Sequence, residues 1–149
     1  MEIVSVILAV VVVTITAIKN KGIPDSVSEI AYIIPHLAFS MWIAMVGGFL
    51  MPSMMEHLSE NMQFIGFLTV VGMLCVAASS YYRTEAAPLH YIGGIMCAIC
   101  ATIVTATIDT RILLIWIVYV FQMFLFKFKN WCFWGEVFVY GLLIYSLIR

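Results

Sequence analysis

A long apolar stretch in the second half of the chain decides the fold: residues 89–126 read LHYIGGIMCAICATIVTATIDTRILLIWIVYVFQMFLF. Asp109 and Arg111 are its only Asp, Glu, Lys or Arg residues. A single helix over the whole stretch would be about 57 Å long, nearly twice the roughly 30 Å hydrocarbon core of a bilayer. The chain must therefore turn at residues 109–111, and the stretch predicts two consecutive membrane spans.

The composition of the whole chain also indicates a membrane protein. Of its 149 residues, 64% are hydrophobic and 10% are charged, and the mean hydropathy is +1.11. Soluble domains contain about 25% charged residues, and so short a chain cannot hide this much apolar surface from water. The net charge of -1 supplies no basic surface for phosphates, so we expect membrane lipid and no nucleic acid as a partner.

Polar breaks divide the remaining sequence into apolar segments close to the length of about 20 residues that a spanning helix needs. The fifth segment is the shortest, at about 22 Å, and if it is re-entrant the number of spans falls to five. We predict an all-α, polytopic membrane helical bundle with one domain, residues 1–149. Its six transmembrane helices are expected at residues 3–18, 29–51, 64–80, 89–108, 112–126 and 131–148.

The positively charged residues beside the predicted spans indicate an orientation. Five of them follow odd-numbered spans: Lys19, Lys21, Arg83, Lys127 and Lys129. Only Arg111 and Arg149 lie at the other membrane face, together with both termini. The positive-inside rule therefore predicts that the connections after odd spans are cytoplasmic and that the termini are outside.

Ionisable residues in or beside the spans are the candidates for a functional site, because charge is costly in lipid. Glu29, Tyr32, His36 and Ser40 recur at intervals of three and four residues, which places them on one face of the helix predicted over residues 29–51. Pro35 would kink that helix. Glu136 has no local partner and would need Arg83, a histidine or a proton. The candidate ligand-binding residues, all near one leaflet, are Glu29, Tyr32, His36, Arg83, His90 and Glu136.

Several of these features also have a structural interpretation. Ser26-x-x-Glu29 matches a capping box, which would pair free amides at a helix start. Glu136 could belong to a buried ion pair. Cys97-x-x-Cys100 has the spacing of a redox or zinc pair, but small residues that allow helices to pack closely are the favoured interpretation.

Several short motifs resemble the six-span DRAM-like superfamily, the damage-regulated autophagy modulators and their prokaryotic relatives. The chain is also similar to small uncharacterised membrane proteins of bacteria and their phages. The resemblance implies a six-helix bundle in which the start of the second span and the histidine of the fourth lie on the same side. Residues 109–149 match poorly, and in the eukaryotic relatives the loop before the second span lies on the non-cytoplasmic side, against the charge bias. The matching positions, between Pro24 and Ile108, are Ser26, Ser28, Glu29, His90, Tyr91 and Gly93.

Three functions fit these features. The favoured one is a membrane protein without catalysis that binds a lipid, a small molecule or a membrane partner through a polar pocket at one leaflet. The second is a metal-dependent intramembrane hydrolase in which Glu29, His36, His90 and Glu136 hold one zinc. The third is a proton or ion pathway through His36 and Glu136. We expect a multi-pass protein of the bacterial inner membrane, with no cofactor and no bound metal, and a second copy of the chain as a further candidate partner.

Overall fold

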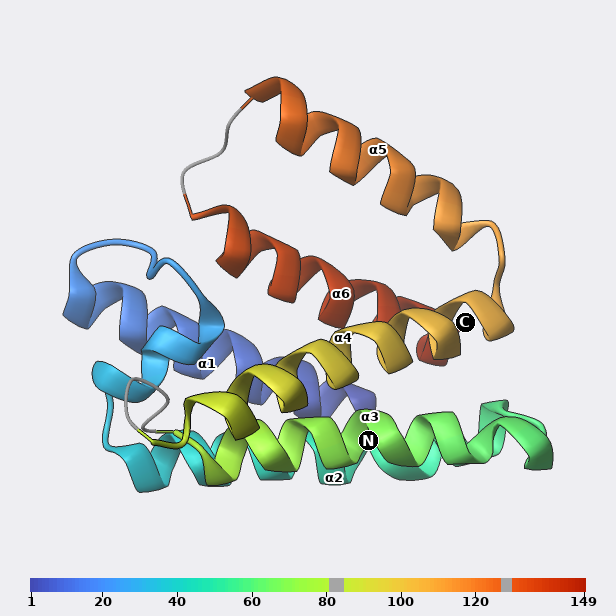
Figure 1. Ribbon diagram of the computed structural model, residues 1–149, viewed down its shortest axis with the longest axis horizontal. Coiled ribbons are helices and arrows are strands. Elements are labelled where there is room, and N and C mark those ends of the chain that lie inside the picture. Colours follow the sequence, from blue (N-terminus) through green and yellow to red (C-terminus); the bar gives the residue numbers. More distant parts are fainter. Residues whose placement is uncertain (81–84, 127–129) are drawn as a thin grey trace.

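A computed structural model describes residues 1–80, 85–126 and 130–149, without the side chains of 123, 124 and 126. In this part of the chain the structure is a bundle of α-helices with two short 3-10 helices and no strand (Figure 1). The α-helices are α1 (Glu2–Asn20), α2 (His36–His57), α3 (Gln63–Ala78), α4 (Ala87–Ile108), α5 (Ile112–Phe126) and α6 (Trp131–Ile148). The 3-10 helices are η1 (Val27–Tyr32) and η2 (Glu60–Met62).

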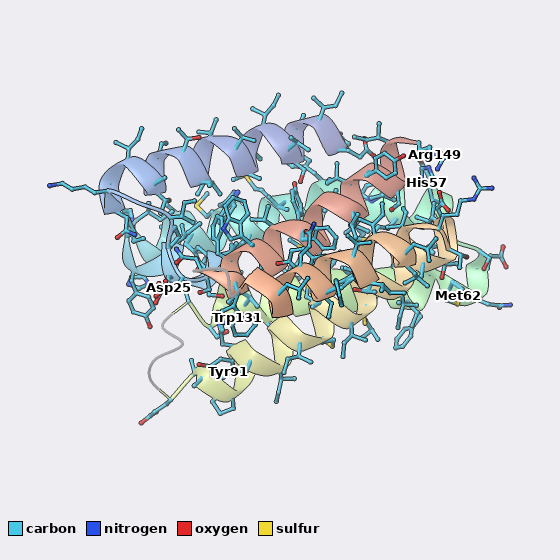
Figure 2. The ribbon with its side chains drawn as sticks, turned by 90° about the horizontal axis from the view of Figure 1, so that it is seen from above. Asp25, His57, Met62, Tyr91, Trp131 and Arg149 are labelled. Atoms are coloured by element: carbon cyan, nitrogen blue, oxygen red, sulfur yellow. The ribbon has the colours of Figure 1, made fainter. Side chains whose placement is uncertain are left out.

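Successive α-helices run in alternate directions, so the ends of the bundle differ in what they carry (Figure 1). Asp25, Tyr91 and Trp131 lie at one end, and His57 and Arg149 lie at the other (Figure 2). We call the first the η1 end and the second the terminal end. This alternation agrees with the prediction that the segments after odd-numbered spans meet at one face.

The described residues include five helical segments long and apolar enough to cross a membrane: α1, α2, α3 with η2, α4 and α6. The α5 helix is shorter and corresponds to the fifth predicted span, residues 112–126, whose crossing of the membrane the sequence left open. Large apolar side chains cover the outside of the bundle, and Ile18, Leu37 and Ile117 are each more than 60% exposed. An outer surface of this kind suits lipid and is unusual in a soluble monomer.

The second predicted span differs from the observed helix. Glu29 and Tyr32 lie on η1, and α2 begins only at His36, directly after Pro35. Proline lacks an N–H group and disfavours helical backbone in the residue before it, so here it begins a helix rather than kinking one. The predicted polar face is therefore divided between two elements. At its other end α2 continues through Pro52 to His57, and the other predicted spans agree closely with the observed helices.

Helix α2 is the most buried of the helices long and apolar enough to cross a membrane in the described part of the chain. Its buried side chains recur every three or four residues along one face, as expected for a helix that packs against neighbours on that side. Phe39, Leu50 and Met54 are completely buried there. A hydrogen bond of 2.6 Å from the Ser40 hydroxyl to the carbonyl oxygen of Ala77 joins α2 to α3.

Helices α3 and α4 approach backbone to backbone, and two glycines allow this. A methyl group at Gly72 would lie 2.7 Å from both the backbone nitrogen of Cys97 and the carbonyl oxygen of Gly93. A methyl group at Gly93 would lie 2.5 Å from Cβ of Cys75. A small residue is therefore a steric requirement at both Gly72 and Gly93.

We expect Gly93→Ala and Gly72→Ala to destabilise the bundle, because overpacking a close contact costs about 1–3 kcal/mol. Gly94→Ala is the matched control, since a methyl group there would meet only Cγ2 of Val76, at 3.9 Å. Thermal unfolding in detergent should rank the wild type and Gly94→Ala together, above the other two variants. Equal unfolding temperatures for Gly93→Ala and Gly94→Ala would contradict the contact.

Candidate functional site

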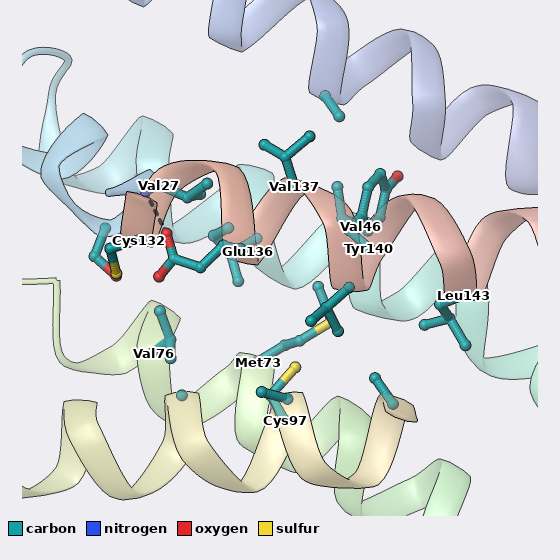
Figure 3. A pocket seen from close by; sticks show the side chains of 18 of the residues that line it. Val27, Val46, Met73, Val76, Cys97, Cys132, Glu136, Val137, Tyr140 and Leu143 are labelled. Carbon is teal, nitrogen blue, oxygen red and sulfur yellow. Dashed lines mark hydrogen bonds between the residues drawn. The ribbon is translucent and has the colours of Figure 1, made fainter. Parts of the chain in front are cut away.

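A cavity of about 970 Å³ lies inside the bundle, with walls from η1 and all six described α-helices. It follows α6 from Cys132 to Leu143, a distance of about 16 Å along the helix axis. Figure 3 shows Cys132 and Glu136 at one end of the lining and Leu143 at the other. Its size lies within the roughly 300–1,000 Å³ typical of ligand pockets.

The wall is mostly apolar and carries few polar groups. The Thr69 hydroxyl donates to the carbonyl oxygen of Ile65 in its own helix and is thereby satisfied. Ser28 and Glu136 lie at the η1 end of the cavity. This arrangement is typical of a pocket that encloses an apolar body and orients it by a few polar contacts.

Within the described residues, two further polar atoms of the lining are buried and have no hydrogen-bond partner: Nε1 of Trp42 and the hydroxyl of Tyr119. The Trp42 side chain is only 5% exposed. A buried donor without a partner costs about 1–3 kcal/mol, so such groups are rare unless something else supplies an acceptor. A ligand with polar atoms in the cavity would supply one.

The start of α6 holds the segment before η1 in place. The Asn130 side-chain amide donates to the carbonyl oxygens of Ile23 and Pro24, at 2.5 and 3.1 Å. The backbone N–H of Phe133 donates to the carbonyl oxygen of Asp25 at 3.0 Å. An amide in the first turn of a helix has no partner within that helix, so Phe133 is free to make this bond.

Glu136 continues the same set of contacts one turn further on. Its Oε2 accepts a hydrogen bond of 2.5 Å from the backbone N–H of Val27, drawn as a dashed line in Figure 3. We predicted that Glu136 would need Arg83, a histidine or a proton, and the structure gives it a backbone amide. Because a carboxylate and an amide form a strong charge-assisted bond, Glu136 joins α6 to η1 at the cavity wall.

His90 forms the second polar contact of η1. Its Nε2 lies 2.8 Å from Oγ of Ser28, and its Nδ1 lies 3.1 Å from the carbonyl oxygen of Ser79. A carbonyl oxygen can only accept, so Nδ1 carries the hydrogen. In the neutral ring Nε2 is then an acceptor, and the Ser28 hydroxyl donates to it. The imidazole is 4% exposed and connects α4, the end of α3 and η1.

The other predicted site residues have different positions. Glu29 belongs to a cap: its backbone N–H donates to Oγ of Ser26 at 3.2 Å, and its carboxylate accepts from the N–H of Asp25 at 3.1 Å. The predicted capping interaction of Ser26 is thus confirmed. Tyr32 and His36 contact each other edge to face, with ring centroids 5.6 Å apart. Glu29, Tyr32 and His36 are not among the lining residues, and Arg83 lies outside the described residues.

The structure gives no support to the alternative function in which Glu29, His36, His90 and Glu136 hold one zinc. In the part of the chain that it describes, no three His, Cys, Asp or Glu side chains are close enough together to hold a metal ion. A polar pathway toward the terminal end is not supported by the hydroxyls there. Those of Thr102, Thr107 and Ser146 donate to carbonyl oxygens of their own helices.

The pairing of Ser28 with His90 was missed, although both residues belong to the motifs that resemble the DRAM-like superfamily. They are 62 residues apart, and no local pattern places them together. Trp42, Cys97 and Cys132 also line the cavity and were not predicted to do so. Their residue types are common in helix packing, so nothing in the sequence marks them as part of a site.

A comparison with protein-family models, curated proteins and solved structures gives no match to this chain. The resemblance to the DRAM-like superfamily therefore stays a prediction, and function must be inferred from the site itself.

We expect Glu136→Leu to destabilise the protein by about 1–3 kcal/mol, because it leaves the part-buried N–H of Val27 without its acceptor. Glu136→Gln keeps an oxygen that can accept this bond and should be close to the wild type. Unfolding in detergent measures both, with Glu56→Leu at the exposed terminal end as the control. If Glu136→Gln is as unstable as Glu136→Leu, the hydrogen bond is not what Glu136 contributes.

Proposed function

We propose that this chain is a six-helix integral membrane protein whose central cavity binds a neutral amphiphile with a long apolar chain. The observation that carries the proposal is the apolar cavity of about 970 Å³ with Ser28 and Glu136 at its η1 end. The polar groups of a fully polar ligand would find few hydrogen-bond partners on this apolar wall, whereas an acyl chain would fill the cavity with apolar contacts.

The polar groups indicate the chemistry of the ligand's head. The Glu136 carboxylate can accept hydrogen bonds, so a head group with hydroxyl or amide hydrogens fits it better than an anionic one. The buried Nε1 of Trp42 is a donor and fits a carbonyl or ether oxygen further along the ligand. A monoacylglycerol or a related neutral acyl lipid has both features.

Helix α5 offers such a lipid a way in from the bilayer. Trp116 and Tyr119 of α5 line the cavity and contact α6 through Phe138. The Tyr119 and Phe138 rings are stacked, with centroids 4.1 Å apart. Because α5 contacts α6 through these few rings, we take α5 as the lateral wall past which a lipid would enter.

The proposed membrane orientation follows from charge. Lys19 and Lys21 lie at the η1 end of the bundle, which we place in the cytoplasm of a bacterial cell, with the terminal end outside. The helix α5, at 15 residues, would cross only if the bilayer thins beside it or if its flanking residues extend into the interface. The pocket then opens from the cytoplasmic leaflet and from the side.

Filling the cavity should abolish binding without unfolding the protein. Ala98 lines the cavity, and we expect Ala98→Phe to weaken binding of monodecanoylglycerol by about tenfold or more, a loss of about 1.4 kcal/mol. Native mass spectrometry in a non-ionic detergent and the quenching of tryptophan emission measure the affinity. Ala106→Phe on the same helix, outside the lining, is the matched control. Unchanged affinity in Ala98→Phe would place the ligand elsewhere.

Single cysteines at the two ends, introduced after the four native cysteines are replaced by alanine, test the orientation. In intact cells a membrane-impermeant maleimide should label Thr110→Cys, at the terminal end, and should leave Asp25→Cys, at the η1 end, unlabelled until the cells are opened. Both positions are exposed, so access to the residue itself is not limiting. The reverse pattern would contradict the orientation, and labelling of both in intact cells would contradict the membrane-spanning arrangement.

A further inference from the structure

We propose that Ser28 and His90 form a nucleophile and general-base pair that cleaves an acyl ester held in the cavity. This inference rests on the proposed function, since the cavity is what would bring the ester to Ser28. It adds a chemical reaction to a site so far described only by binding, and it requires no metal ion.

The geometry is that of an activated serine. Oγ of Ser28 lies 2.8 Å from Nε2 of His90, and Nδ1–H of His90 is bound to the carbonyl oxygen of Ser79 at 3.1 Å. The carbonyl fixes the tautomer that leaves a lone pair on Nε2 facing the serine hydroxyl. A nucleophile, its base and a group that orients the base are the three parts that serine-dependent acyl transfer uses.

The backbone supports this arrangement from both sides. Gly93, one turn after His90, is in close contact with α3, which fixes α4 against the end of α3 where Ser79 lies. On the other side, the bond from Val27 N–H to Glu136 holds the residue next to Ser28. The pair is therefore held by rigid elements, as a catalytic geometry requires.

The position of Ser28 suits both the substrate and water. Ser28 lines the cavity, so the ester carbonyl of a lipid whose chain fills the cavity can reach Oγ. The same residue belongs to η1 at the end of the bundle, where Asp25 is exposed. Water can reach this end even when the rest of the cavity is filled with lipid.

The reaction has two steps. Oγ of Ser28 attacks the ester carbonyl carbon while its proton passes to Nε2 of His90. The carbon–oxygen bond to the alcohol then breaks, and the alcohol leaves with that proton, so that Ser28 becomes acylated. A water molecule attacks the acyl-serine with His90 again taking the proton, and return of the proton to Oγ releases a carboxylic acid and restores Ser28. Ester and water are consumed, and acid and alcohol are formed.

A purely structural role for the pair is the alternative, because each group satisfies a polar neighbour. The two roles differ in reactivity. A serine that only donates a structural hydrogen bond does not react with a fluorophosphonate, whereas an activated serine does. Covalent labelling is the first readout, since it reports the nucleophile directly and needs no product release.

The experiment treats the purified full chain in non-ionic detergent with a decyl fluorophosphonate and with a short ethyl fluorophosphonate, and locates the adduct by peptide mass spectrometry. We expect the wild type to carry the adduct on Ser28. Labelling should be lost in Ser28→Ala and slowed about 100-fold or more in His90→Gln. Ser59→Ala, an exposed serine at the terminal end, should label like the wild type.

The outcomes separate this inference from the proposed function. The absence of an adduct, an adduct on another residue, or labelling of folded His90→Gln at the wild-type rate would overturn the pair. If monodecanoylglycerol still binds in that case, the cavity remains a binding site only. If the short probe labels Ser28 in a His90-dependent way but monodecanoylglycerol does not bind, the pair stands and the lipid cavity is wrong. Because the adduct is mapped on the wild type, the test holds even if a variant fails to fold.

Discussion

The backbone N–H and C=O groups of residues 23–27, which lead into η1, lie beside an apolar bundle and need hydrogen-bond partners. The rest of the site depends on which residues supply those partners. Carbonyl and amide groups that lie against apolar surroundings need partners from the protein itself. The start of α6 supplies them through the side-chain amide of its N-cap Asn130, the backbone N–H of Phe133 and the carboxylate of Glu136. These contacts keep η1 against the bundle, close one end of the cavity and hold Ser28 beside His90.

Most of the helices could be predicted from hydropathy alone, because an apolar environment forces each apolar segment of sufficient length into a helix. The second span is the exception and shows why. Pro35 permits either a kink within one helix or the start of a new one, and the choice depends on whether the residues before it find partners elsewhere. Residues 23–27 find them at the start of α6, more than 100 residues away in sequence, beyond the reach of any local pattern.

The sequence could predict near which end of the helices the candidate site residues lie. It could not predict which neighbouring helix each side chain faces. Hydropathy places Glu136 and His90 near the η1 end, where both lie, but it carries no information on which way a side chain faces a neighbouring helix. Glu136 therefore has an amide partner instead of a cation, and His90 has a serine that sequence alone did not connect with it. The large cavity could likewise not be predicted from the sequence, because its wall consists of the same apolar residue types that fill a solid core.

The close contact of Gly72 with Gly93 joins helices that follow each other in the chain, whereas the hydrogen bond of 2.5 Å between Ser5 and Tyr140 joins residues 135 apart. Contacts between near neighbours form early, and contacts that close long loops form late. We therefore expect the α3–α4 pair to assemble first and α1 and α6 to meet last. Until they meet, the future cavity is an open apolar groove. In the proposed bilayer arrangement lipid molecules would occupy that groove during assembly, so the last helices would close around a lipid that is already in place.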